Sequence, residues 1–406
     1  MNSKKWIAFG VIFLVLGINL AFGLPRLTHF SAVDEPYWTF TRIPKFWTAV
    51  ATQKWRSTNI NDKPGITTAI ITGPGLWLID PLNVKSFLSN PKSLAMVREV
   101  LKVYASFRLP NYLLTLIGLF LIFFFIRKLL GERIALISAI LIGLSPIILG
   151  ISLVINPDSL LWIFISLSIL SYLVHYQNKL PLDFPSKKPL SLGAYVRAFT
   201  RRKKYILFSG IFLGLALLTK YVANIVFIYF FALIFLRYIL EKETKQSIDR
   251  YFKDNLLDFA LVIIVSAAVF GALFPATWIH PNMILNGTIF SAAFKSVWPA
   301  FAAIAVSVLL DAIFLKGYLL HYPLDFLRKH ANFFIRLGGI LFMIIIVFVF
   351  FNTWLGMKFY DFQNILASPK SGKTFVIDPI RLSRDFFADF FALIFGLTPL
   401  AFLAIL

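Results

Sequence analysis

The chain has 406 residues, of which 59% are hydrophobic, 17% aromatic and only 15% charged. A soluble fold of this length could not enclose so much apolar surface, so the composition excludes an ordinary soluble protein and indicates one solvated by lipid. The net charge of +21 is typical of basic loops at anionic headgroups, and no nucleic-acid motif accompanies it. The absence of cysteine from the sequence excludes disulfides, thiolate metal sites and cysteine nucleophiles.

Apolar runs recur along the whole chain and predict an all-α polytopic membrane protein with about ten spans, since one crossing takes about 20 apolar residues. The first run, residues 6–25, has the shape of a signal peptide but is long enough to cross, and we interpret it as a retained helix. The stretch 205–240 is too long for one crossing and predicts two short helices that turn near Lys220. The other predicted spans are residues 108–126, 134–154, 159–177, 256–275, about 288–311, 338–353 and 386–406.

Basic residues are concentrated in alternate connections between the spans, which predicts that these connections face the cytoplasm. We therefore expect a multi-pass protein of the cytoplasmic (inner) membrane with a cytoplasmic N-terminus. The residues behind this orientation are Arg127, Lys128, Arg133, Lys187, Lys188, Arg197, Arg201, Arg202, Lys203, Lys204, Lys242, Lys245, Arg250, Lys253, Arg328, Lys329 and Arg336. The extracytoplasmic side then receives the loop 26–107, the turn at residues 156–158, the turn at Lys220, the segment 276–287 and a loop of about 354–385.

The first extracytoplasmic loop, residues 26–107, is long and rich in Trp, Pro and Thr. We expect it to be folded, with short helices that lie in the membrane interface, where aromatic rings settle at the headgroup level. The aromatic residues that suggest these helices are Trp38, Phe40, Phe46, Trp47 and Trp55.

Two adjacent acids, Asp34 and Glu35, follow the first helix by about ten residues, at the predicted outer surface. They are either solvated loop acids or a site in which a carboxylate beside the membrane acts as a general base. Asp62-Lys63-Pro64-Gly65 lies later in the loop, and Pro-Gly is typical of a turn. Asp62 and Lys63 form either a solvated ion pair or a place where the lysine is held against an anionic phosphate.

Three further charged residues lie at the predicted outer ends of spans. Arg108 either snorkels to the interface or binds phosphate with both arms of its guanidinium group. Asp158 either caps a helix after Pro157 or belongs to a site on the same surface as Asp34. Lys220 either anchors two short helices or contacts a lipid phosphate. Because all these groups map to one membrane face, a shared site is the simplest interpretation.

Metal and nucleotide signatures are absent from the sequence. The five histidines show no metal-ligand spacing, and there is no P-loop or dinucleotide fingerprint. A need for a divalent metal ion is nevertheless left open, since carboxylates are also metal ligands. The histidines are His29, His175, His280, His321 and His330.

The order of the charged motifs resembles the GT-C glycosyltransferases. The nearest branch contains the protein O-mannosyltransferases and the aminoarabinose transferase of lipid A. The resemblance covers residues 1–290 approximately and implies a GT-C-type helix bundle there, with residues 291–406 as additional C-terminal membrane helices. The motifs that carry it are Asp34-Glu35, the run from Asp62 to Thr68, Arg108-Leu109-Pro110, the run from Asn156 to Leu161, the run from Gly214 to Lys220, and Pro275-Ala276-Thr277-Trp278.

The resemblance also implies roles for individual residues. Asp34 is expected to be the catalytic carboxylate, with Glu35 beside it and Asp158 at a second acidic position of the site. Lys63, Arg108 and Lys220 are expected to bind the donor phosphate, with Asp62 as a secondary candidate. The expected donor is a sugar linked to polyprenyl phosphate, and the expected reaction is transfer to an extracytoplasmic acceptor hydroxyl, with inversion.

Two departures from the family pattern affect this expectation. Many members have a second proline, or a histidine before Pro-Gly, where this chain has Asp62-Lys63-Pro64-Gly65. The chain also stops at Leu406 within an apolar run, where many relatives continue, so that it is either a minimal member or lacks a C-terminal part.

Two other classes of function compete with transfer. A transporter or flippase of lipid-linked sugars predicts ionisable groups near the middle of spans and a second half that repeats the first. Most charges here lie in loops or at span ends, which favours an enzyme. A non-catalytic relative that binds lipid-linked sugar is the third possibility, and the identities of the sugar and the acceptor are not encoded in any motif.

Overall fold

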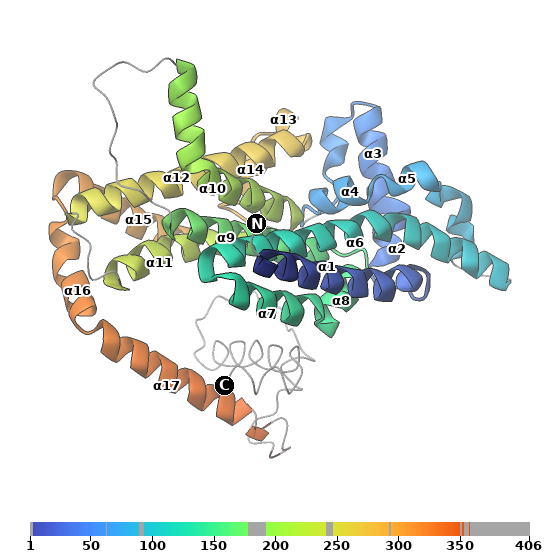
Figure 1. Ribbon diagram of the computed structural model, residues 1–406. Helices are drawn as coiled ribbons and strands as arrows, with labels where there is room; N and C mark the ends of the chain where they lie inside the picture. Colours follow the sequence, from blue (N-terminus) through green and yellow to red (C-terminus); the bar gives the residue numbers. More distant parts are fainter. Residues whose placement is uncertain are drawn as a thin grey trace. The chain divides into compact units, whose positions relative to one another are not determined.

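The computed structural model defines the fold within one large part of the chain. Every regular element in this part is a helix, as the sequence predicts, and Figure 1 shows their arrangement. The described residues are 3–61, 63–88, 93–177, 192–240, 247–291, 294–349, 351–352 and 357. The chain divides into two compact units, the first comprising residues 1–144, 148–237 and 244–321 and the second residues 145–147, 238–243 and 322–406.

Five helices within the described residues are long and apolar enough to cross a membrane, and the number rises to seven if two bent helix pairs each form one span. The predicted number of about ten is therefore not confirmed, although the multi-pass character is. The predicted span 386–406 and almost all of the predicted loop 354–385 lie outside the described residues. The five helices are α1 (Ser3–Gly23), α6 (Leu94–Leu130), α9 (Pro157–Gln177), α11 (Ile225–Leu240) and α12 (Ile248–Leu273).

The longest helix, α6, begins well before the predicted span 108–126. Its 37 residues extend about 55 Å at 1.5 Å per residue, whereas a bilayer core is about 30 Å thick. Ser93 caps its N-terminus by accepting a hydrogen bond from the backbone of Met96 at 3.3 Å. The extra turns belong to the first loop, because they pack against α4 (Ile66–Thr72) and α5 (Gly75–Leu78) instead of against lipid.

The centre of the first unit is formed by α6, α9, α10 (Leu192–Thr219) and α12, with α1 and α7 (Glu132–Gly143) packed beside α6. Small residues allow close packing, as is usual between membrane helices. At Gly214 of α10, a Cβ atom would lie only 2.7 Å from the side chain of Val269 in α12. Other helices that lie wholly or mostly in this unit are α8 (Pro146–Ser152), α13 (Ala276–Ile279), α14 (Asn282–Gly287) and α15 (Trp298–Phe314).

The predicted turn near Lys220 is confirmed. Helix α10 ends at Thr219, and Lys220 has an extended backbone with φ −158°. A short 3-10 helix, η5 (Tyr221–Asn224), then leads into α11. This break places Lys220 at the end of a helix, beside the other helix ends of that face.

A buried polar network joins three helices at the opposite end of α9. His175 lies 2.9 Å from the carboxylate of Asp258 in α12, and Lys203 of α10 pairs with the same carboxylate. Asp258 and His175 are both buried, so the network holds α9, α10 and α12 together within the helix bundle.

The first loop folds into short helices, as expected, but most of the aromatic residues that suggested them do not face the interface. Trp38, Phe40 and Phe46 are buried, and the indole of Trp47 donates a hydrogen bond to the carbonyl of Ala69 at 2.9 Å. The loop is long enough to build its own apolar core, so these rings pack inward. The helices are η1 (Leu24–Thr28), α2 (Glu35–Tyr37), η2 (Trp38–Arg42), α3 (Ile43–Ala51), η3 (Trp55–Thr58), α4, α5 and η4 (Pro81–Phe87).

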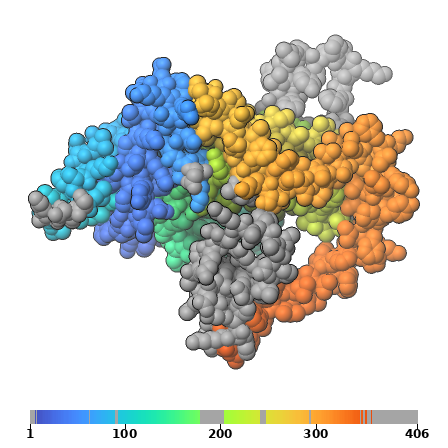
Figure 2. Space-filling view, turned by 180° about the vertical axis from the view of Figure 1, so that it is seen from behind, coloured from blue at the N-terminus to red at the C-terminus, as the bar shows by residue number. Residues whose placement is uncertain are grey.

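The loop also contacts the segment that follows α12. The rings of Trp55 and Trp278 lie 5.2 Å apart, which brings η3 against α13. Figure 2 shows the loop in blue beside this yellow-orange segment. The region that the sequence places outside the membrane is thus a packed assembly of separate chain segments.

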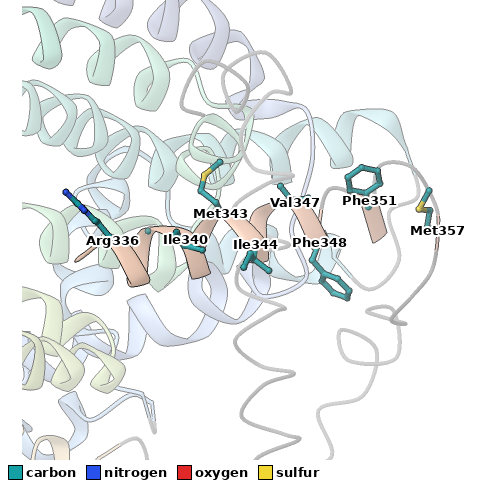
Figure 3. A pocket seen from close by; sticks show the side chains of 9 residues that line it. Arg336, Ile340, Met343, Ile344, Val347, Phe348, Phe351 and Met357 are labelled. Atoms are coloured by element: carbon teal, nitrogen blue, oxygen red, sulfur yellow. The ribbon is translucent and has the colours of Figure 1, made fainter. Parts of the chain in front are cut away.

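The second unit contains most of α16 (Tyr318–Lys329) and all of α17 (Ala331–Val349). One face of α17 lines an apolar pocket of about 980 Å³, which Figure 3 shows from Arg336 to Met357. None of the described residues that line it is acidic. Because the predicted reaction needs a carboxylate to accept the proton of the acceptor hydroxyl, this pocket does not match the predicted chemistry.

Candidate functional site

A second, polar cavity brings together four of the charged residues that the sequence singles out. Its volume is about 220 Å³, and it lies in the first unit. Three parts of the chain contribute: the first loop, the turn before α9 and the end of α10. The described residues that line it are Asp34, Trp38, Arg42, Asn61, Lys63, Asn156, Pro157, Asp158 and Lys220.

The first wall of the cavity follows from helical spacing. Asp34, Trp38 and Arg42 are four residues apart, and the short helices α2 and η2 carry them on one face. The second helix contains a π-turn, a geometry that is frequent at functional sites. The segment therefore presents an acid, an aromatic ring and a guanidinium group to the same space.

Asp34 precedes the first residue of α2 and belongs to this wall. Among the residues that the structure describes, no group donates a hydrogen bond to its carboxylate; only its backbone carbonyl is used, by the N–H of Trp38 at 3.3 Å. An ionised carboxylate without a protein donor is available to accept a proton or a hydrogen bond from a ligand. This is the arrangement that a general base requires.

Trp38, which lines the cavity, packs against Gly65. Trp38 is buried, and a Cβ atom at Gly65 would lie 2.1 Å from its ring. Gly65 also has φ +63°, in the left-handed region that glycine adopts without strain. On the ring of Trp38, the guanidinium carbon of Arg42 lies 4.8 Å from the centroid, within the range of a cation–π contact.

Lys63 is positioned by a tight turn that is tied to the end of α10. The side chain of Asn61 donates a hydrogen bond to the carbonyl of Lys63 at 2.5 Å. The N–H of Gly65 donates to the carbonyl of Thr219 at 3.2 Å, and the hydroxyls of Thr67 and Thr219 lie 2.6 Å apart. These bonds join the loop to the residue that precedes Lys220, so the two lysines enter the cavity from connected backbones.

Asp158 lies in the first turn of α9 and forms an ion pair across the cavity. The ammonium of Lys220 donates to its carboxylate at 2.7 Å, and both side chains are partly exposed. The alternative in which Asp158 caps α9 does not apply, because the carboxamide of Asn156 accepts the hydrogen bond from the N–H of Asp158 at 2.9 Å. Asn156 takes the capping role and leaves the carboxylate of Asp158 to the lysine.

Glu35 and Arg108 lie outside the cavity lining, in a fully buried ion pair. The guanidinium of Arg108 donates to both carboxylate oxygens of Glu35, at 2.8 Å and 2.5 Å, and neither side chain is exposed. Arg108 also donates to the carbonyls of Leu27 at 2.6 Å and Phe30 at 2.5 Å. Its guanidinium is therefore engaged within the protein, which differs from the snorkelling position that the sequence suggests.

The carboxylate of Glu35 receives two further hydrogen bonds from backbone. The N–H of Ala32 lies 2.7 Å and the N–H of Ile155 2.8 Å from its oxygens. Glu35 thus connects the loop, α6 and the turn before α9 through one carboxylate. Because Asp34 is its neighbour in the chain and Asn156 is the neighbour of Ile155, this network fixes two walls of the cavity relative to each other.

The structure thus brings together Asp34, Lys63, Asp158 and Lys220, and it separates Glu35 and Arg108 from them as a support. Asp62 lies outside the described residues. Sequence reasoning missed Arg42, which the spacing of four from Asp34 through Trp38 could have indicated. Within the described part of the chain, no group of three or more His, Asp or Glu side chains is placed to hold a metal ion.

The sequence was compared with the models of known protein families. Residues 98–282 match the family model of the dolichyl-phosphate-mannose-protein mannosyltransferases. The resemblance to the GT-C glycosyltransferases is thereby confirmed. In this GT-C-like chain, the matched range contains Arg108, Asp158 and Lys220, whereas Asp34 and Lys63 precede it.

A solved structure with a similar course is the archaeal oligosaccharyltransferase AglB from Archaeoglobus fulgidus, in complex with an inhibitory peptide and a dolichol-phosphate. The sequences are 15% identical, the similarity covers 81% of this chain and 39% of AglB, and the TM-score is 0.44. The chain thus spans well under half the length of that protein. No curated protein sequence matches the chain.

Proposed function

We propose that the chain is a membrane glycosyltransferase that moves a sugar from a polyprenyl-phosphate donor to an acceptor hydroxyl on the extracytoplasmic side. The observation that supports this most directly is the polar cavity of about 220 Å³, in which the carboxylate of Asp34, without a hydrogen-bond donor among the described residues, lies with the ammonium groups of Lys63 and Lys220. The match of residues 98–282 to the mannosyltransferase family supports the same class of donor.

The proposed reaction needs one base and a set of cations. Asp34 accepts the proton of the acceptor hydroxyl. At the same time, the oxygen of that hydroxyl attacks the anomeric carbon of the sugar from the face opposite the phosphate. The bond from the anomeric carbon to the phosphate oxygen breaks, and its electron pair stays on that oxygen. The phosphodiester monoanion becomes a phosphate monoester dianion, so cations that contact it stabilise the transition state more than the bound donor.

Lys63 and Lys220 are the cations that we assign to this phosphate. Both line the cavity, and the hydrogen bonds of Gly65 and Thr67 to Thr219 hold their backbones together. Asp158 keeps the ammonium of Lys220 in place until the donor binds. In this proposal, Glu35 and Arg108 act through position: they hold the loop that carries Asp34 and do not touch the donor.

The test is transfer by the purified protein in proteoliposomes. A panel of radiolabelled polyprenyl-phosphate sugars is offered with a mixture of envelope acceptors, and Asp34→Asn serves as the matched control because it changes charge with almost no change in shape. We expect label to leave the lipid fraction with the unchanged protein only. Movement of the intact labelled lipid between leaflets, equal in both proteins and without sugar release, would contradict transfer and indicate a flippase.

A further inference from the structure

Arg42 is a charged residue of the cavity that the reaction outlined above does not yet use. It lines the cavity together with Asp34 and lies eight residues further along the chain, at the end of the π-turn that begins at Trp38. Its guanidinium is stacked on Trp38, and no described residue accepts a hydrogen bond or forms an ion pair with it. A guanidinium group that is oriented but leaves its donors unused is suited to bind a planar or tetrahedral oxyanion with two arms.

The charge of the cavity depends on this residue. Among the described residues that line the cavity, the three cations Arg42, Lys63 and Lys220 face the two carboxylates of Asp34 and Asp158, a net charge of +1. Lys220 is paired with Asp158 at 2.7 Å, so these two groups offset each other. Without Arg42, the charges of the described lining residues would sum to zero.

We infer that Arg42 is a third phosphate-binding residue, which contacts the donor phosphate with its guanidinium and adds a positive charge to the cavity. The inference rests on the proposed function, and it adds a residue that the charged motifs do not include. Trp38 restricts the rotamers of Arg42, so that little side-chain entropy is lost when the phosphate binds. The contact strengthens as the leaving phosphate gains its second charge.

The experiment compares Arg42→Gln and Arg42→Lys with the unchanged protein in two measurements. The first is the affinity for radiolabelled polyprenyl phosphate without a sugar, in nanodiscs; the second is sugar transfer. Loss of a charged, two-armed contact is expected to lower affinity and kcat/KM of Arg42→Gln by about 10- to 100-fold. The affinity and kcat/KM of Arg42→Lys are expected to lie between those of Arg42→Gln and the unchanged protein, because lysine keeps the positive charge but not the planar, two-armed guanidinium group. Arg56→Gln, at an exposed position of helix η3 in the same loop, is the matched control and is expected to bind normally.

Two results would overturn the inference. One is that Arg42→Gln and Arg56→Gln have the same affinity for polyprenyl phosphate and the same kcat/KM for sugar transfer. The other is an equal loss in Arg42→Gln and Arg42→Lys, because packing on Trp38 and not charge would then explain the effect. The binding measurement needs no turnover, so it separates this inference from the proposed function: a protein that transfers no sugar at all, yet ranks the variants as expected, refutes only the latter.

Discussion

Glu35 and Arg108 form a fully buried ion pair with two hydrogen bonds, which joins the first loop to the middle of α6 over 73 residues of sequence. Both carboxylate oxygens of Glu35 and all three guanidinium nitrogens of Arg108 have hydrogen-bond partners within the protein. Such a pair is strongly coupled to folding, because removal of one member leaves the other charge buried and uncompensated.

We therefore predict that Arg108→Met mainly lowers stability. Breaking a buried pair typically costs about 3–5 kcal/mol, so Tm should fall by several degrees in detergent. The nine tryptophans provide the fluorescence signal for thermal unfolding. The affinity for polyprenyl phosphate of the fraction that remains folded should stay near normal; a selective loss of affinity at unchanged Tm would assign Arg108 to the phosphate instead.

Asp34→Asn is predicted to lower the rate of transfer and to leave stability unchanged, in contrast to Arg108→Met. Loss of the base should reduce transfer by about 10²- to 10⁴-fold, whereas Tm should hardly change, since no described group bonds to the carboxylate. Asp34→Glu should retain part of the rate because it keeps a base that is displaced by one methylene. Equal rates in Asp34→Asn and the unchanged protein would remove Asp34 from the mechanism.

Gly65→Ala is predicted to impair both stability and transfer. The left-handed backbone costs an alanine about 1–2 kcal/mol, and the added Cβ would meet the ring of Trp38. Displacement of that ring also moves Arg42. Gly10→Ala in α1 is the control, because a Cβ there has no neighbour within 4 Å. A Tm for Gly65→Ala at or above that of Gly10→Ala would contradict the described turn.

Lys220→Met and Asp158→Asn are predicted to be non-additive. The ammonium and the carboxylate are 2.7 Å apart, so either change should alter the behaviour of the partner. Lys220→Met should raise KM for the donor; Asp158→Asn should have a smaller effect on KM, because it leaves the lysine charge in the cavity. A double-mutant cycle on kcat/KM measures the coupling, and strictly additive effects would mean that the pair is absent in solution.

The lack of cysteine makes the orientation directly measurable. Val33→Cys places a thiol at a side chain that is 90% exposed beside Asp34, and Lys204→Cys places one at an exposed position in the middle of α10, in the basic run that the sequence assigns to the cytoplasm. A membrane-impermeant maleimide added to intact cells should label the first and not the second. The reverse labelling would place the cavity on the cytoplasmic side and contradict the predicted topology.

The sequence predicts the membrane class, the break at Lys220 and the common face of Asp34, Lys63, Asp158 and Lys220. The common face follows from counting crossings, because every second connection lies on the same side. The distances between these four residues do not follow from the count of crossings, since they depend on which helices are neighbours in the bundle.

The sequence does not reveal that Glu35 turns inward while Asp34 faces the cavity. Adjacent acids have the same chemistry, and only the position of Arg108 on α6 and of the N–H of Ile155 decides which one is buried. Similarly, the rings of Trp38 and Phe46 pack inward because the loop has a core of its own, which composition alone does not distinguish from an interfacial aromatic belt.

Thr219 accepts a hydrogen bond from Gly65 with its carbonyl and contacts the hydroxyl of Thr67, so one residue at the end of α10 anchors the turn that follows Lys63. The proposed lipid donor therefore meets Lys63 and Lys220 as one connected group. The segment of Asp34, Trp38 and Arg42, which Glu35 joins to α6, packs against this group through Trp38 and Gly65. Displacement of either side by a bound donor therefore also affects the other.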